Sequence, residues 1–376
     1  MKIKCRRLFI GNSFLLDKVV AVEDGVIREI TSCGRADYSC DTLTAGLVDC
    51  HTHGGYGCSV MSPTADEYAA WLNWLARHGV TGVLAGVYTA SIEDMRRAIQ
   101  ACRDVMDAQK AGNTEGCRLL GVHLEGPFVQ DARPGVGAMD TQYTQPPSVA
   151  LYKEITHDCE DIVKAVTLAP ELDGAGELIE FLVGNNVRVL AGHTNAAYER
   201  GEEFFLNGVS GVTHFYNAAV GLHHRNPGLI LASLENENVF AEAICDMKHV
   251  HPAMLRLLIR EKDAGKVIAI SDAMRLAGLP EGEFEEGGVS YEIRDGACFA
   301  PDGSLAGGIT TLSEQAGRLR SIGISDIDIL RMVSLAPRRF LGLDEYPRVG
   351  SDADFAAFND DMSLAFTVVR GKVYLP

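Results

Sequence analysis

The chain has 376 residues, of which 47% are hydrophobic, and it carries a formal net charge of −17 at pH 7. This length exceeds one typical domain and accommodates a large α/β barrel with a small appended domain. The charge argues against nucleic acid or an anionic membrane surface as a partner, and we find no apolar span long enough for a membrane helix. The start, MKIKCRRLFIGNS, lacks the apolar core of a signal peptide, and the ten cysteines include no Cys-x-x-Cys pair. We therefore expect reduced thiols and a cytoplasmic location.

The two ends of the chain differ from its middle. Residues 1–45 and 346–376 contain short apolar stretches separated by turns, such as KVVAVEDGVIREIT at 18–31 and FTVVRGKVYL at 366–375. These stretches are typical of β-strands and hairpins. We expect them to pair into one small β-sandwich domain, with residues 46–345 inserted between them as a second domain.

The middle of the chain alternates apolar strand-like runs with amphipathic helical stretches, which is typical of parallel βαβ units. In one such stretch, residues 91–106, Ser91 and Asp94 are predicted to form a capping box. Eight strand–helix units are the number in a (β/α)8 barrel, and a doubly wound open sheet is the alternative. The expected strands are 45–51, 82–89, 118–125, 164–170, 187–193, 211–217, 240–246 and 266–272.

A His-x-His pair, His51 and His53, closes the first expected strand. Both imidazoles project from the same face, because side chains alternate sides along a strand. This geometry suits a metal ion, although histidines at a strand end can also be structural, with their nitrogens hydrogen-bonded to the chain.

Other metal-binding residue types close further strands of the expected barrel. The C-terminal strand ends of such a barrel converge on one face, where active sites are built. Any one of these residues alone is more often structural, but together they predict a site for one or two divalent ions such as zinc or iron. The residues are Glu125, His193, His214 and Asp272.

Such a site performs metal-assisted hydrolysis. A divalent ion lowers the pKa of bound water and polarises a carbonyl, so that hydroxide attacks an amide or ester. Asp272 would take the proton of the water and pass it to the leaving amine. The alternative role for Asp272 is to cap the turn that follows it.

Six motifs carry a resemblance to a known family. In chain order, HLEGPF, GHT, THFYNA, HHRNPG, CDMKHVH and SDAM resemble the motif set of the N-acetylglucosamine-6-phosphate deacetylases, in the amidohydrolase superfamily of distorted (β/α)8 barrels. The similarity spans nearly the whole chain, and the N-acetylgalactosamine-6-phosphate deacetylases share almost all of it. It implies hydrolysis of the acetamide of N-acetylglucosamine 6-phosphate to glucosamine 6-phosphate and acetate, by a homodimer.

The resemblance also implies a role for each ligand. Glu125, His193 and His214 correspond to the ligands of the principal metal ion. His51 and His53 match those members that keep this pair and can hold a second ion. The glutamate on the third strand, in place of a bridging lysine on the fourth, is specific to this branch of the superfamily.

The same resemblance assigns the substrate-binding residues. Asp272 would be the general base and then the acid, and His249 would contact the substrate and polarise the acetyl carbonyl, although it could also be a surface histidine. Arg225 supplies the positive charge that a phosphomonoester requires, and in some members the equivalent arginine reaches the site of the partner subunit. Asn217 and the Ala218 backbone would contribute phosphate or sugar contacts.

Two departures from the family pattern leave the sugar specificity open. Many relatives carry Lys-Gly-Ala-His after the strand-three glutamate, but this chain reads QDARPGVGAMD at 130–140, with no histidine between His123 and His157. SLAGG at 304–308 replaces a more usual Ser-Gly-Ser or Ala-Gly-Ser loop. Two other functions stay open. A different amidohydrolase, acting on another N-acyl or cyclic amide, would have no need of HHR at 223–225, and a non-catalytic relative should have lost metal ligands.

Overall fold

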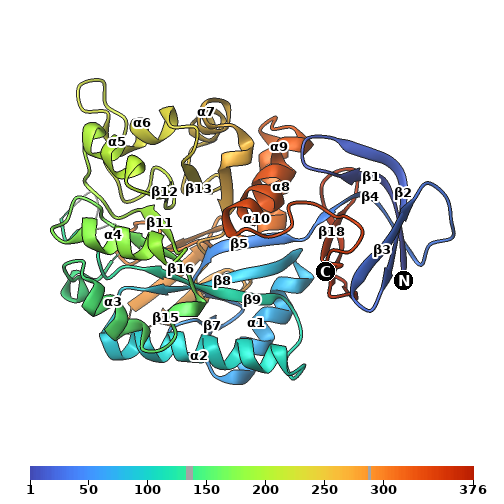
Figure 1. The fold of residues 1–376 in the computed structure, drawn as a ribbon, viewed down its shortest axis with the longest axis horizontal. Coiled ribbons are helices and arrows are strands. Elements are labelled where there is room, and N and C mark those ends of the chain that lie inside the picture. The colour runs from blue at the N-terminus through green and yellow to red at the C-terminus, as the bar shows by residue number, and fades with distance from the viewer. Residues whose placement is uncertain (133–138, 287–288) are drawn as a thin grey trace.

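Eight parallel strands form the central sheet of this computed structural model, which describes residues 1–132, 139–286 and 289–376. In spatial order the strands run β5-β8-β9-β10-β11-β12-β13-β14. Figure 1 shows this sheet in the middle of the larger part of the molecule, with helices around it. The sheet confirms all eight expected strands and their parallel direction. Their bounds are Leu47–Thr52, Val80–Tyr88, Arg118–Glu125, Val163–Leu168, Arg188–Ala191, Val209–Val212, Phe240–Ile244 and Val267–Ile270.

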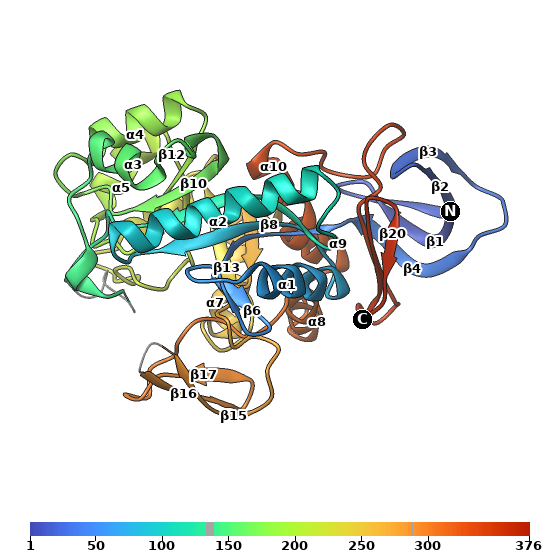
Figure 2. The same cartoon turned by 90° about the horizontal axis from the view of Figure 1, so that it is seen from below.

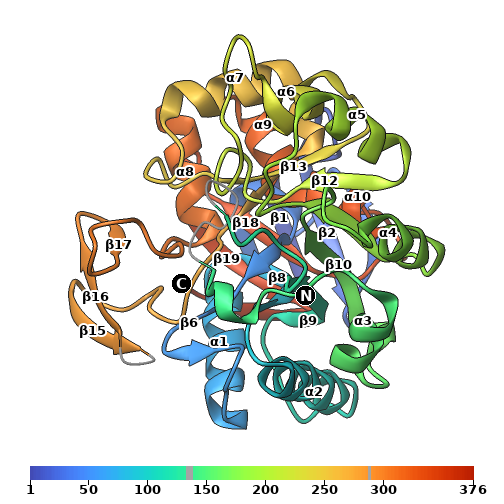
Figure 3. The ribbon, with the colours of Figure 1, turned by 90° about the vertical axis from the view of Figure 1, so that its left-hand side faces the viewer.

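The helices surround this sheet, as expected for a barrel (Figure 3). Helix α2 begins after Ser91, whose hydroxyl accepts a hydrogen bond from the Asp94 backbone N–H at 3.1 Å. The Asp94 carboxylate accepts from the Ser91 hydroxyl at 2.6 Å, so the expected cap forms with a different reciprocal bond. The helices are α1 (Ala65–Arg77), α2 (Ile92–Lys110), α3 (Val149–Thr156), α4 (Ala175–Gly184), α5 (Tyr198–Leu206), α6 (Gly228–Glu235), α7 (Pro252–Lys262), α8 (Leu312–Ser321), α9 (Asp326–Leu330) and α10 (Ala336–Leu341), with a π-helical turn at Arg331–Leu335.

The barrel closes between its first and last strands without a regular ladder, since β5 and β14 are the two ends of the sheet order. Just beyond β14, the Asp272 N–H donates to the His51 carbonyl at 2.9 Å. The Asp49 carboxylate accepts from the Ser271 N–H at 3.2 Å. The Asp49 side chain and the loop after β14 therefore connect the two end strands of the sheet across this seam, next to His51 and Asp272.

The inside of the barrel is apolar below the C-terminal strand ends. A buried cluster fills it, with Val48 and Cys50 from β5, Leu190 from β11 and Ile270 from β14 among its members. The outward-facing strand residues pack instead against the helices in a second, larger cluster. Polar side chains therefore collect at one end of the barrel, where this apolar filling stops.

The terminal segments form a separate β unit that contains both chain ends (Figure 2). Its seven strands make one continuous sheet that curls over its own apolar core, with Val26 bridging Asp352, and not two independent sheets. We keep 1–45 and 346–376 as the proposed bounds of this domain. The strands are β1 (Lys2–Phe9), β2 (Phe14–Glu23), β3 (Val26–Thr31), β4 (Tyr38–Ala45), β18 (Phe355–Phe358), β19 (Leu364–Val369) and β20 (Lys372–Tyr374).

A small three-stranded sheet follows β14, and the sequence analysis did not anticipate it. Its strands are β15 (Gly282–Glu286), β16 (Val289–Arg294) and β17 (Ala297–Phe299), and its small buried cluster consists of Leu276, Ile293 and Cys298. This insert projects from the barrel close to the short β6–β7 hairpin, whose strands are Gly54–Gly55 and Cys58–Ser59 (Figures 2 and 3). All ten cysteines are free, and no helix among the described residues is long and apolar enough to cross a membrane.

Arg338 connects the last helix, α10, to the junction between the two domains. Its guanidinium is buried and donates to the Gly46 carbonyl at 3.0 Å, to the Asp344 carbonyl at 3.2 Å and to the Thr81 hydroxyl at 3.3 Å. Gly46 is the one residue between β4 and β5. Burial lowers the pKa of Arg338 to about 10, which still leaves the side chain protonated at neutral pH.

Replacing this arginine should destabilise the whole protein. Arg338→Met removes the main donor to the buried Gly46 carbonyl, so we expect the free energy of unfolding to fall by about 2 to 4 kcal/mol. The neighbouring Arg339→Met is the control, since Arg339 pairs with Glu345 at the surface and should cost less than about 1 kcal/mol. Urea denaturation of both variants checks this, and equal losses would contradict it.

Candidate metal centre

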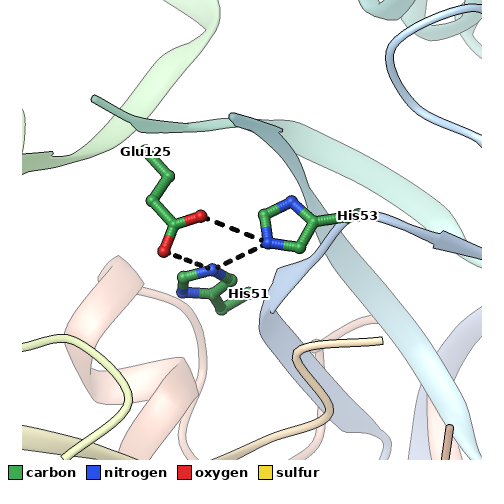
Figure 4. Close-up of side chains that lie close together, drawn as sticks. All are labelled: His51, His53 and Glu125. Carbon is green, nitrogen blue, oxygen red and sulfur yellow. Dashed lines mark hydrogen bonds and ion pairs between the residues drawn. The ribbon is translucent and has the colours of Figure 1, made fainter. Parts of the chain in front are cut away.

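The Glu125 carboxylate lies at the centre of the polar end of the barrel, and four imidazoles surround it (Figure 4 shows two of them). Its Oε1 lies 3.1 Å from His193 Nε2 and 3.2 Å from His214 Nε2. The same oxygen lies 3.4 Å from His51 Nε2, and Oε2 lies 3.2 Å from His53 Nε2. One buried carboxylate thus contacts every histidine that the sequence analysis named as a metal ligand.

Asp272 completes the group from the other side of the seam. Its Oδ1 lies 3.2 Å from His53 Nε2 and 3.6 Å from His51 Nε2. The side chains of His53 and Asp272 are 14% and 15% exposed, whereas the Glu125 side chain is only 4% exposed. Asp272 and His53 therefore form the edge of the centre that an incoming molecule meets first.

The backbone turns sharply at three of these residues. His193, His214 and Asp272 have φ values of 48°, 29° and 47°, in the left-handed region that residues other than glycine seldom adopt. Each lies two residues beyond its strand, whereas the sequence analysis expected the strands to run through them. Such strain is typical of functional sites, because the surrounding structure must hold the backbone in place.

The charges within the cluster shift the pKa values of its ionisable side chains. Burial acts to lower the pKa of His51, but the negative charge of Glu125 raises it well above its ordinary value. Burial acts to raise the pKa of Asp272, but the hydrogen bond from His53 and the charges of the histidines lower it to about 2. Both carboxylates are thus held ionised by the imidazoles around them.

The donor set fits a divalent ion. His193 Nε2 and His214 Nε2 lie 2.9 Å apart, and His51 Nε2 and His53 Nε2 lie 3.3 Å apart. Two nitrogen lone pairs at this distance repel unless a proton or a cation lies between them. Imidazole nitrogen and carboxylate oxygen suit zinc and similar ions. Among the groups whose ligand atoms lie within 4.8 Å of one another, two triads contain Glu125, namely Glu125–His193–His214 and His51–His53–Glu125.

His249 also lies in a hydrogen-bonded pair that the sequence analysis did not foresee. Its Nδ1 is 2.7 Å from Asp246 Oδ2, and its Nε2 is 2.8 Å from the Ala306 carbonyl. Burial acts to lower the pKa of His249, but the hydrogen bond and the charge of Asp246 raise it to about 9. The imidazolium therefore donates from both nitrogens, and one of these bonds reaches the loop that follows the insert.

The expected substrate loop lies partly beside the metal centre and partly in solvent. The Asn217 amide donates to the His214 carbonyl at 3.1 Å, and the Ala218 carbonyl accepts from the Thr194 N–H at 3.2 Å. Arg225 is exposed, its Nη1 lies 2.9 Å from His224 Nε2, and no contact between Arg225 and the metal cluster is found among the described residues. Residues 133–138 of the atypical QDARPGVGAMD segment lie outside the described residues.

Some residues around the centre escaped the sequence analysis. Glu242 and His123 are fully buried within strands, and a charged or polar residue inside an apolar strand is the signal that could have found them. Gly86 lies against His53, whose Nδ1 is 2.8 Å from the Gly86 carbonyl. A Cβ atom at position 86 would lie 2.7 Å from the same nitrogen, so the ring leaves no room for a side chain there.

Residues 42–374 match the model of the amidohydrolase family. The chain belongs to this family. It is 32% identical over 374 residues to the N-acetylglucosamine-6-phosphate deacetylase of Bacillus subtilis, covering 96% of this chain and 94% of that protein. It is 31% identical over 350 residues to the N-acetylgalactosamine-6-phosphate deacetylase of Escherichia coli, covering 91% and 90%. The resemblance to the hexosamine-6-phosphate deacetylases is confirmed.

Solved structures agree with these sequence comparisons. An N-acetylglucosamine-6-phosphate deacetylase from Mycobacterium smegmatis, solved as an aspartate-to-alanine variant in complex with N-acetylglucosamine 6-phosphate, matches with a TM-score of 0.91 at 26% identity, over 100% of this chain and 99% of that chain. The enzyme from Thermotoga maritima matches with a TM-score of 0.86 at 30% identity, over 99% of both chains. The expected fold, a distorted barrel with a β unit from both termini, is confirmed.

A methyl group at position 86 should disturb the metal centre, because its Cβ would lie 2.7 Å from His53 Nδ1 and 2.9 Å from the Thr52 carbonyl oxygen. In Gly86→Ala the new Cβ displaces the His53 ring, so we expect at least about tenfold weaker metal binding, the scale found when a ligand loses its support. Gly176→Ala is the control, because a Cβ there meets no atom within 4 Å. Metal content after dialysis against a graded chelator series checks this, and equal content in the two variants would refute it.

Proposed function

We propose that this chain hydrolyses the acetamide of N-acetylglucosamine 6-phosphate, giving glucosamine 6-phosphate and acetate. The observation that carries the proposal is the buried Glu125 centre with all four histidines and Asp272 in contact, in a chain that matches deacetylases of this class along nearly its whole length. A non-catalytic relative would have no reason to keep this set of ionised and strained residues.

The metal ligands follow from the two triads. We propose that Glu125, His193 and His214 hold the principal ion, that His51 and His53 hold a second, and that zinc is the ion. When bound, a divalent ion supplies a water of lowered pKa and polarises the acetyl carbonyl. The remaining steps belong to the side chains of the chain itself.

Asp272 moves the proton. Its carboxylate, ionised and open to solvent on one side, accepts a proton from the attacking water as the water oxygen bonds to the acetyl carbon. The same carboxyl then donates that proton to the nitrogen as the C–N bond breaks, so that acetate and the free amine leave. His249 is a cationic donor for the carbonyl oxygen, with the substrate taking the place that the Ala306 carbonyl now occupies.

The phosphate needs a positive charge in an acidic protein, and the loop that carries Arg225 supplies it. We propose that Arg225 binds the 6-phosphate with help from Asn217 and the Ala218 backbone. Because Arg225 is exposed and makes no contact with its own metal cluster among the described residues, we propose that it acts in a homodimer. The ten free cysteines support a cytoplasmic location.

Removing the proton carrier should leave binding intact. Asp272→Asn keeps the shape of the side chain but cannot accept a proton, so turnover should fall by about a hundredfold or more while metal content stays near that of the wild type. Steady-state kinetics together with metal analysis check this. Near-normal turnover would reduce Asp272 to a cap of its turn.

The substrate class is tested with the gluco and galacto N-acetylhexosamine 6-phosphates and their unphosphorylated forms. We expect the wild type to prefer the phosphorylated gluco sugar. Arg225→Ala should raise KM for this sugar by a factor equivalent to about 2 to 4 kcal/mol of binding free energy, because a charge-assisted bidentate contact is lost. The residual reaction on the unphosphorylated sugar should change much less.

The outcomes of this panel separate the alternatives. Preference for the galacto epimer would replace the proposed sugar and keep the reaction. Equal turnover of phosphorylated and unphosphorylated sugars, or equal losses for both in Arg225→Ala, would leave an amidohydrolase that acts on a different amide.

A further inference from the structure

A third carboxylate lies directly behind the metal centre. Glu242 is on β13, where its side chain is completely buried and points into the barrel. Its Oε2 lies 3.2 Å from Nδ1 of His51, the ring nitrogen that faces away from Glu125. Both nitrogens of this fully buried imidazole therefore face carboxylates, Glu242 on the inner side and Glu125 on the metal side.

The cluster of His51, His123 and Glu242 has the residue types of a metal site, but its hydrogen bonds are already committed. His123 Nδ1 lies 3.0 Å from the Cys50 carbonyl, and His123 Nε2 lies 2.8 Å from the Thr167 hydroxyl. The Cys50 carbonyl can only accept, so His123 Nδ1–H donates to it, and Nε2 faces the Thr167 hydroxyl. Glu242 is therefore a hydrogen-bond partner of His51 and not a ligand of a third ion.

His53 and His214 lack a carboxylate in this position. The outer nitrogen of His53 faces the neutral carbonyl of Gly86, and His214 Nδ1 has no hydrogen-bond partner among the described residues. A carboxylate behind a ligating imidazole fixes the ring and its tautomer and makes the metal-facing nitrogen a stronger ligand. This device is placed behind His51, which belongs to the His51–His53–Glu125 triad and not to the Glu125–His193–His214 triad.

The charges point the same way. Glu125 and Asp272 together carry two negative charges, enough to balance one divalent ion. A buried carboxyl oxygen without a hydrogen-bond partner is costly unless nearby positive charge compensates it, and Glu242 Oε1 has no such partner among the described residues. A second divalent ion at His51 and His53 would provide that compensation.

We infer that Glu242 is a positioning residue which holds His51 for a second metal ion and supplies negative charge that this ion requires. The inference rests on the proposed two-ion centre. It makes the number of ions per chain depend on a residue that touches neither ion nor substrate.

The test measures Zn²⁺ stoichiometry and affinity in the full-length protein, by mass spectrometry of the metal after equilibration with competing chelators. Wild type should bind two ions per chain. Glu242→Gln keeps the size of the side chain and removes its charge, so the weaker of the two ions should bind about 10 to 100 times less tightly while the tighter one is unchanged. Glu242→Asp, which keeps the charge but withdraws it from His51, is the second variant and should also weaken that ion.

A double-mutant cycle shows whether Glu242 acts through His51. His51→Asn should weaken binding of the second ion to a measurable extent, and adding Glu242→Gln should cause little further weakening, because the two changes remove one interaction. Unchanged affinity in both Glu242 variants, fully additive losses, equal weakening of both ions, or a single ion in the wild type would each overturn the inference. Metal binding needs no substrate, so a failed sugar panel with two ions bound would reject the proposed function and leave the inference standing.

Discussion

The rest of the centre depends on one buried anion, the Glu125 carboxylate, and on what can neutralise it. Removing a carboxylate from water costs several kcal/mol unless cationic partners surround it. Four imidazole nitrogens lie within 3.4 Å of its two oxygens. Neutral imidazoles carry no charge, so the compensating positive charge comes from protons on these nitrogens or from a bound metal ion. Proton and metal ion therefore compete for the same nitrogen atoms, and a divalent ion satisfies Glu125 while relieving the repulsion between the paired imidazoles.

The seam of the barrel joins the histidine cluster to Asp272. His51 ends the first strand and Asp272 follows the last, and the backbone of Asp272 donates directly to the carbonyl of His51. Asp49 holds the same seam by accepting from the Ser271 N–H, and burial raises the pKa of Asp49 to about 6 against the hydrogen bonds from Ser271. A regular ladder would have flattened the backbone here. Closure by side chain and loop instead lets Asp272 adopt the left-handed turn that aims it at His53.

The sequence predicted the barrel and the cluster of histidines and carboxylates at one end of it because two simple regularities coincide: strands repeat along the chain, and polar residues gather where parallel strands end. It failed where the decisive fact is a backbone conformation or a partner from a distant element. His193 and His214 were expected to close strands that in fact stop two residues earlier, because a left-handed turn at a histidine cannot be predicted from residue type alone. Glu242 was missed because it sits in mid-strand, and its partner His51 is 191 residues away. The position of Arg225 relative to the histidine cluster depends on the path of its loop, and no local sequence pattern specifies that path.

The unexpected insert gains a role from its attachment points. The chain leaves the barrel after Asp272, forms β15–β17 and returns through Ala306 to Gly308, whose N–H donates to the Asp272 carbonyl at 2.6 Å. A Cβ on Gly308 would lie 2.0 Å from the Ser271 carbonyl, so glycine is needed for this close return. The Ala306 carbonyl on the same returning strand of chain accepts from His249. Asp272 and His249 are thus both contacted by the returning end of this segment. Under the proposed mechanism, a substrate that displaces the Ala306 carbonyl from His249 acts on the same stretch of chain that contacts Asp272, which links the recognition of the acetyl carbonyl to the placement of the base.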